Sequence, residues 1–289
     1  SDWRPRGRGS VASLRDMAPF SVSLMLTDLI STFYMKLPQF FLGKLYPTAT
    51  LGAFDQAVKL KDMPVTAATQ SVQSVTFPAL SEVRGDAPKF AESYRQVVLI
   101  TAYVMFPAML GLSAVAHDLF ALLLSEKWMP TVPYFEVVCL AGLFYPVGMI
   151  CYNVLKVMSR GPLIVRLEVV KKLLMTVVFA VTIPHSVTAV VWGLVVIAFG
   201  EMAVNFLATR RFTRFTTRRF LRTLLPVALV SGTMYLLVRL TACAVPGHLL
   251  LRLAAQLLVG AAAYVGLSVL FRLEAFGLLC DLMKKQAAR

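Results

Sequence analysis

The chain has 289 residues, of which 58% are hydrophobic and 15% are charged, and its formal net charge is +14. Soluble domains carry roughly a quarter charged residues, so this composition excludes an ordinary soluble protein and indicates an all-α, polytopic membrane protein. A nucleic-acid partner is not expected, because membrane topology accounts for most of the positive charge.

Eight hydrophobic segments are long enough to cross a bilayer as helices, which takes about 20 residues. They lie at about 17–43, 62–82, 94–115, 132–157, 162–184, 187–209, 220–243 and 249–271. The connections between them are short, so no soluble domain is expected between the spans. Residues 1–16 are a basic lead-in without the apolar core of a signal peptide, and 273–289 are a short amphipathic tail.

The 29 Lys and Arg residues are distributed unevenly between the two sides of the membrane. Eight spans place both termini on one side, and most of the basic residues lie on that side, in the segments 4–15, 84–95, 156–172, 210–222 and 272–289. The positive-inside rule therefore predicts that both termini are cytoplasmic.

The first two spans carry polar faces. Asp28, Thr32, Lys36 and Gln39 recur at helical spacing in the first span, and Thr66, Thr69, Gln70 and Gln73 share a face of the second. Charged groups at this depth are costly unless they face protein or water. We expect both faces to line one water-filled cavity; the alternative is hydrogen bonding between helices, a common use of Ser, Thr and Gln.

Charged residues also occur in later spans. Glu168 precedes Lys171 and Lys172 by three and four residues, which predicts an intrahelical ion pair or a group that reaches the cytoplasmic rim. Glu201 and Asn205 share a helix face, and we weigh a proton relay against a carboxylate satisfied by its neighbours.

Basic residues follow at the cytoplasmic rim, among them Arg210, Arg211 and Arg214. They are interpreted either as an attractant for an anionic head group or as determinants of topology that bind anionic lipid.

The remaining polar residues predict no enzyme centre. The four cysteines form no CxxC pair and the three histidines have no second ligand one helical turn away, so neither a metal site nor a cofactor is expected. The segment HDLFALLLSEKW (117–128) is predicted to be an amphipathic helix at the outer surface. The last two spans are nearly free of charge and are expected to face lipid.

Several stretches resemble one family. FFLGKLYPTATLGAFDQAVKLKDMP (40–64), FPALSEVRGDAPKFAESYRQ (77–96), SEKWMPTVP (125–133) and SRGPLIVRLEVVKK (159–172) are similar, in order and spacing, to segments of Wzx-type polysaccharide flippases. The WzxC-like branch of lipopolysaccharide and exopolysaccharide exporters resembles the chain best. The likeness covers residues 1 to about 210.

The resemblance implies the multidrug/oligosaccharidyl-lipid/polysaccharide exporter fold, with two lobes around a central cavity. Residues 17–212 then correspond to the six-helix second lobe and 213–272 to two peripheral helices, without the first lobe. The implied activity is the transfer of undecaprenyl-diphosphate-linked oligosaccharide across the bacterial inner membrane. The implied partners are bilayer lipids, a first lobe or a second copy, and polysaccharide polymerase machinery.

Other functions stay open at this point. A drug or metabolite exporter of the same superfamily would have a more apolar, aromatic cavity than the second span offers, whereas a lipid II flippase is not distinguished by cavity charge. A polyprenyl-linked glycosyltransferase or polymerase would need acid/base residues in larger outer loops. A truncated chain that inserts without transporting is a further alternative.

Overall fold

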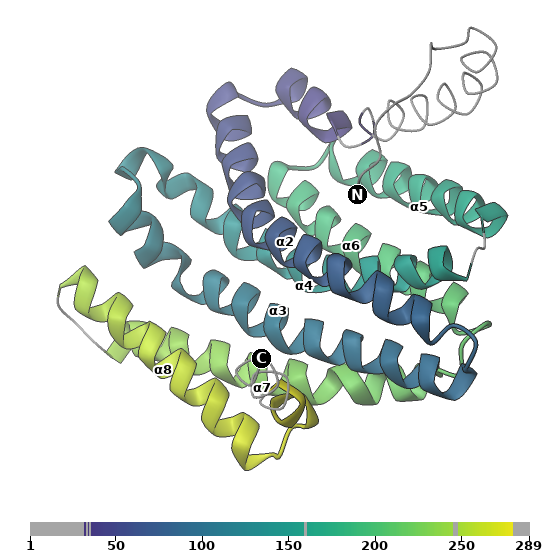
Figure 1. Ribbon diagram of the computed structural model, residues 1–289. Coiled ribbons are helices and arrows are strands. Elements are labelled where there is room, and N and C mark those ends of the chain that lie inside the picture. Colours follow the sequence, from purple (N-terminus) through teal and green to yellow (C-terminus); the bar gives the residue numbers. More distant parts are fainter. Residues whose placement is uncertain (1–31, 33, 35, 159–160, 245–247, 280–289) are drawn as a thin grey trace, which may run out of the picture. The chain divides into compact units, whose positions relative to one another are not determined.

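The computed structural model describes residues 32, 34, 36–158, 161–244 and 248–279, which form helices and turns without any strand. The chain divides into two units, Ser1–Tyr46 and Pro47–Arg289. In the first unit, the described residues from 36 to 45 are helical. The second unit holds α2 (Thr48–Glu82), α3 (Ala87–Leu123), the 3-10 helix η1 (Glu126–Thr131), α4 (Val132–Val157), α5 (Gly161–Thr182), α6 (Val187–Thr209), α7 (Thr217–Ala244) and α8 (Leu249–Leu270) (Figure 1).

Local sequence signals set several helix ends. Asp86 caps α3: its carboxylate accepts a hydrogen bond from the backbone N–H of Lys89, and Pro88 fills a position in the first turn where no amide donor is needed. This hydrogen bond holds the pKa of the Asp86 carboxyl below its ordinary value. Ser186 caps α6 in the same way through the backbone N–H of Ala189.

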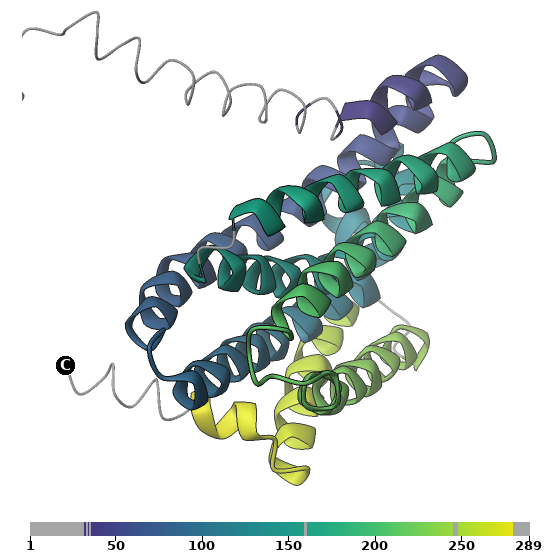
Figure 2. The same cartoon turned by 90° about the vertical axis from the view of Figure 1, so that its right-hand side faces the viewer.

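Helix α4 packs against α2, α3 and α6. Two of its glycines allow close approach: a Cβ on Gly142 would come within 3.1 Å of the Val65 side chain, and one on Gly148 within 3.2 Å of the Met202 Cα. Small residues at helix contacts are the usual solution in membrane bundles, where close packing replaces the hydrophobic effect. Helix α5 lies along α6 at this side of the unit (Figure 2).

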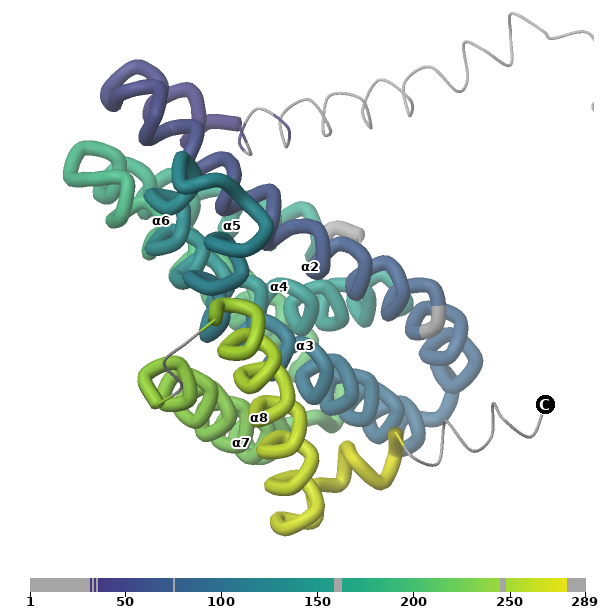
Figure 3. Tube along the Cα trace, turned by 90° about the vertical axis from the view of Figure 1, so that its left-hand side faces the viewer, coloured from purple at the N-terminus to yellow at the C-terminus, as the bar shows by residue number. Residues whose placement is uncertain are grey.

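Helices α7 and α8 pack against α3 and against each other (Figure 3). Their contact with α3 is polar as well as apolar. The Tyr264 hydroxyl donates to the Tyr103 carbonyl oxygen at 2.6 Å, and the Tyr103 hydroxyl donates to Ser268 Oγ at 3.0 Å. Nearer the other end, the Arg252 guanidinium pairs with the Asp118 carboxylate. Helix α8, the last predicted span, is therefore fastened to α3 by specific bonds.

Five of the described helices are long and apolar enough to cross a membrane, and α2 and α5 are not among them. Charged residues interrupt the apolar run inside both helices, among them Asp62 in α2 and Lys171 in α5, so the predicted count of eight spans stays a prediction. The chain is nevertheless an all-α, multi-pass membrane protein, as its composition predicted.

Two predicted boundaries are wrong. The helix expected at 62–82 begins at Thr48, because nothing breaks it between Pro47 and Lys61, and its internal prolines, Pro64 and Pro78, do not end it. The segment 117–128 is not a separate surface helix: α3 runs through it to Leu123, and η1 begins at Glu126. No glycine or proline interrupts the chain from Ala114 to Leu124, so the helix extends.

Two of the cysteines are packing residues of the bundle. Cys139 and Cys151 are fully buried, and Cys151 Sγ accepts a hydrogen bond from the Tyr94 hydroxyl at 3.0 Å. The same hydroxyl lies 3.2 Å from Thr209 Oγ1, so Tyr94 joins α3, α4 and the end of α6.

Candidate functional site

Helix α2 has two contrasting faces. Phe54, Ala57, Val65 and Leu80 are buried on the side that packs against its neighbours. On another side, exposed polar residues follow one another at helical spacing, and we name them the α2 polar row: Lys59, Asp62, Thr66, Gln70 and Ser74.

The four residues of α2 that were predicted to line a cavity differ in exposure and in hydrogen bonding. Thr69 is only 8% exposed and donates to the Val65 carbonyl oxygen at 2.6 Å, so it lies outside the α2 polar row. Gln73 is half-buried. Thr66 and Gln70 are exposed, and their side chains make no hydrogen bond to other described residues, so their polar atoms are available to a ligand or to water.

Tyr145 and Tyr152 of helix α4 share one helix face, and the first of them lies near the α2 polar row. Tyr145 of α4 is 43% exposed, and both Asp62 of α2 and Glu201 of α6 lie close enough to act electrostatically on its hydroxyl. Residues far apart in the sequence are thus brought to one polar face made by α2, α4 and α6.

The second tyrosine of this α4 face, Tyr152, lies near α5. Tyr152 of α4 lies between two ammonium groups: the Lys156 Nζ is 4.6 Å and the Lys171 Nζ 5.0 Å from its ring centroid. Cations at this distance from an aromatic ring are attracted to it. Lys171 is buried and also pairs with Glu168, which is the intrahelical ion pair predicted from their spacing.

Glu201 and Asn205 occupy different environments although they share a helix. Glu201 is half-buried and lies within electrostatic reach of Lys171 and Lys172. Asn205 is buried; its amide nitrogen donates to the Gly148 carbonyl oxygen at 3.3 Å, and its amide oxygen has no partner among the described residues. Asn205 therefore contributes to the contact between α6 and α4.

The polar face predicted for the first span belongs to the other unit. Asp28 lies outside the described residues, Thr32 and Lys36 are exposed, and Gln39 is half-buried. That this face and α2 line one cavity stays a prediction.

The predicted rim residues of the second unit lie in the turn before α7. Arg210, Arg211 and Arg214 are exposed there, and the Arg210 guanidinium donates to Thr217 Oγ1 at 3.0 Å. Within the described part of the chain, no group of three His, Cys, Asp or Glu side chains is placed to hold a metal ion.

Residues 1–133 match a protein family described as polysaccharide biosynthesis protein. The chain is 25% identical over 146 residues to the lipopolysaccharide biosynthesis protein WzxC of Escherichia coli strain K12, covering 50% of this chain and 30% of WzxC. It is 22% identical over 141 residues to the teichuronic acid biosynthesis protein TuaB of Bacillus subtilis strain 168, covering 49% of this chain and 29% of TuaB. The chain is thus similar to polysaccharide biosynthesis proteins over part of its length.

This relationship confirms the resemblance to Wzx-type proteins that the sequence motifs predicted. The structure of the lipid II flippase MurJ, in an inward closed conformation, has the same fold over 89% of this chain and 55% of MurJ, with a TM-score of 0.71 and 14% identity. That likeness shows the fold alone. In the alignments with WzxC and TuaB, the chain spans about 30% of their length.

Sequence reasoning missed part of the polar face formed by α2, α4 and α6. Lys59 and Asp62 were expected at or beyond the start of a span, and the tyrosines of α4 were not singled out. Two signals were available: the helical spacing of Thr66 and Gln70 continues upstream to Asp62 and Lys59, and Tyr145 and Tyr152 are seven residues apart, which places them on one helix face.

Proposed function

We propose that the chain forms one lobe of a transporter that moves undecaprenyl-diphosphate-linked oligosaccharide across the bacterial inner membrane for lipopolysaccharide, O-antigen or exopolysaccharide synthesis. The observation that carries this proposal is the α2 polar row, a line of hydroxyl, amide and charged groups left open on a helix of a membrane bundle. The names of WzxC and TuaB support the class of substrate.

The chemistry of the α2 polar row suits a hydrated sugar. The free amide of Gln70 both donates and accepts hydrogen bonds, and the Thr66 hydroxyl does the same, which matches the mixed donors and acceptors of sugar hydroxyls. Tyr145 adds an exposed aromatic ring to the same face. A purely apolar wall, as expected for a drug exporter, would leave sugar hydroxyls unpaired at considerable cost.

In this proposal, basic residues bind the diphosphate of the substrate, and acidic residues carry the ion that drives transport. In this proposal Lys36 meets the diphosphate as a compact cation, and Arg210, Arg211 and Arg214 attract it at the cytoplasmic rim. Asp28 and Glu201 are the candidates for carrying a coupling ion, with Glu201 held among Lys171, Lys172 and Glu168. Both termini of the chain are cytoplasmic.

A second lobe-sized partner belongs to the proposal, because one lobe does not enclose a cavity on its own. Residues 17–212 supply the six-helix lobe and 213–272 the two peripheral helices. Alternating access then rocks this lobe against a first lobe or a second copy.

The test is made in the host cell, where the native partners are present. Deleting the gene should leave lipid-linked oligosaccharide in the inner leaflet, so a membrane-impermeant lectin should label much less of it on spheroplasts while the total pool rises. Unchanged lectin labelling after deletion would overturn the proposal.

Variants of α2 test whether the oligosaccharide passes along the α2 polar row. The double variant Thr66→Leu, Gln70→Leu should restore little lectin labelling at equal protein level, because it removes free hydrogen-bonding groups from the face. The control Thr233→Leu replaces an exposed threonine of α7 whose hydroxyl donates to the Leu229 carbonyl, and it should restore labelling fully. Full restoration by the double variant would remove the α2 polar row from the path.

A further inference from the structure

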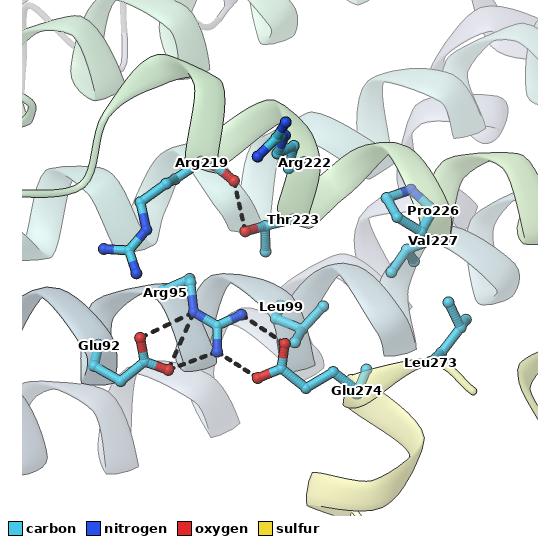
Figure 4. A pocket seen from close by; sticks show the side chains of 11 residues that line it. Glu92, Arg95, Leu99, Arg219, Arg222, Thr223, Pro226, Val227, Leu273 and Glu274 are labelled. Carbon is cyan, nitrogen blue, oxygen red and sulfur yellow. Dashed lines mark hydrogen bonds and ion pairs between the residues drawn. The ribbon is translucent and has the colours of Figure 1, made fainter. Parts of the chain in front are cut away.

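A pocket of about 370 Å³ lies at the basic end of the bundle, away from the α2 polar row. Three elements line it: α3, the first half of α7, and the segment that follows α8. We name it the basic pocket; its charged lining residues are Glu92, Arg95, Arg219, Arg222 and Glu274 (Figure 4).

The two carboxylates of the basic pocket are already used. The Arg95 guanidinium donates to Glu92 through Nε at 3.1 Å and to Glu274 through Nη1 at 2.9 Å, and it makes further bonds to both (Figure 4). Arg95 thus holds the segment after α8 against α3, and its donors are engaged.

Arg219 and Arg222 are differently placed. Both are exposed and lie in the first turns of α7, and neither makes an ion pair with any described carboxylate. Arg219 acts on Glu92 only electrostatically. Neither guanidinium has a carboxylate partner among the described residues, and both lie near the positive end of α7, which favours an anion there. Figure 4 shows the two side chains apart, so an anion held by both requires these exposed side chains to turn toward each other.

The rest of the pocket is apolar apart from Thr223, whose hydroxyl donates to the Arg219 carbonyl oxygen. Figure 4 shows Pro226, Val227 and Leu273 at the end away from Arg219. On its other side, α7 exposes Leu221, Leu225 and Leu229, as expected of a helix that faces lipid. The pocket therefore joins a cationic end to an apolar end beside a lipid-facing helix, which is the polarity of a phospholipid.

We propose that the basic pocket binds the phosphate of an anionic phospholipid, held by Arg219 and Arg222, with the glycerol and the start of an acyl chain against Pro226 and Val227. Basic pockets between transmembrane helices are known to select anionic head groups. Such a lipid would contact α3, α7 and the segment after α8 at once, and would strengthen the contact that Arg95 and Glu274 make.

The experiment counts bound lipids on the purified chain by native mass spectrometry, during titration with phosphatidylglycerol or phosphatidylcholine. Arg219→Gln, Arg222→Gln is compared with Arg84→Gln, Arg218→Gln, which removes the same charge from exposed arginines that do not line the pocket. The pocket pair should lose about tenfold more affinity for phosphatidylglycerol than the control pair, and phosphatidylcholine binding should change in neither. Equal losses in the two pairs would overturn the proposal in favour of general surface attraction.

A variant that is expected to increase lipid affinity distinguishes an effect on binding from a loss of folding. Glu274→Gln removes a negative charge and releases part of Arg95, so phosphatidylglycerol should bind several-fold more tightly. Glu82→Gln, at an exposed carboxylate on the same end of the unit, is the control and should have little effect. Weaker binding by Glu274→Gln would contradict the site.

Inorganic phosphate distinguishes the two sources of a phosphate group. If the pocket is a lipid site, millimolar phosphate should compete no better than chloride at equal ionic strength. Displacement of the lipid by phosphate, dependent on Arg219 and Arg222, would assign the pocket to a free phosphate and overturn the lipid assignment.

Discussion

Helices α2 and α8 distribute the same kinds of residue in opposite ways. Helix α8 exposes leucines, with Leu251 66% and Leu258 71% exposed, and buries Gln256, Tyr264 and Ser268 against its neighbours. Helix α2 buries Phe54 and Val65 and exposes the α2 polar row. In a bilayer, α8 has the pattern of a helix that faces lipid, whereas the polar face of α2 is suited to water, substrate or another protein surface.

This difference explains why α8 is apolar enough to be counted as a membrane span and α2 is not. A polar group that faces hydrocarbon is left without hydrogen-bonding partners, and the free-energy cost is too high for a row of them to persist. The α2 polar row therefore marks a surface that lipid does not cover.

The largest expected effect comes from placing one lysine on each helix. Leu258→Lys puts a charge on the lipid-facing side of α8 and should reduce insertion by about 3 kcal/mol, whereas Gln70→Lys should change it by much less, because that face meets water. Apparent insertion free energies from a glycosylation-mapping assay measure both. Equal costs at the two positions would mean that α2 faces lipid after all.

Glycines give the next contrast. Gly148→Ala places a Cβ within 3.2 Å of the Met202 Cα, where α4 meets α6, and should lower stability by about 1–3 kcal/mol through overpacking. A Cβ at Gly266 of α8 meets no atom within 4 Å, so Gly266→Ala should be neutral or stabilising by up to about 1 kcal/mol. Thermal unfolding of the two variants in detergent decides whether the α4–α6 contact is as close as described.

The smallest effect concerns two tyrosine hydroxyls. Tyr264→Phe removes the bond to the Tyr103 carbonyl and should cost about 1 kcal/mol of stability. Tyr145→Phe removes an exposed hydroxyl from the α2–α4–α6 face, so its melting temperature should match that of the unchanged protein. A stability loss in Tyr145→Phe as large as in Tyr264→Phe would mean that the face is closed by contacts within the lobe.

The sequence predicted most helices of this chain because long apolar runs are local signals. The positions of α4 and α6 agree closely with their predicted spans, and the spacing of Glu168 and Lys171 was enough to predict their ion pair. The bonds that fasten α8 to α3 were not predictable, since Tyr103 and Tyr264 are distant in sequence and nothing local pairs them. The grouping of Asp62, Tyr145 and Glu201 was missed for the same reason.

The α2 polar row was only half predicted. Thr66 and Gln70 are exposed as the pattern suggested, but Thr69, one position from Gln70, is buried, because a helix turns by about 100° per residue. Sequence spacing predicts that residues share a face; which part of that face is covered depends on where α4 packs.

The length of α2 has a mechanical consequence. With 35 residues it is roughly 50 Å long, more than the 40–45 Å of a whole bilayer, and α3 with 37 residues is as long. A tilt of about 10° around the midpoint of such a rod displaces each end by roughly 4 Å, in opposite directions. Because the turn at 83–86 joins the two helices, a displacement of that turn would be passed along both of them toward Thr48 and Leu123, with Pro64, Pro78 and Pro107 as the points where the helices can bend.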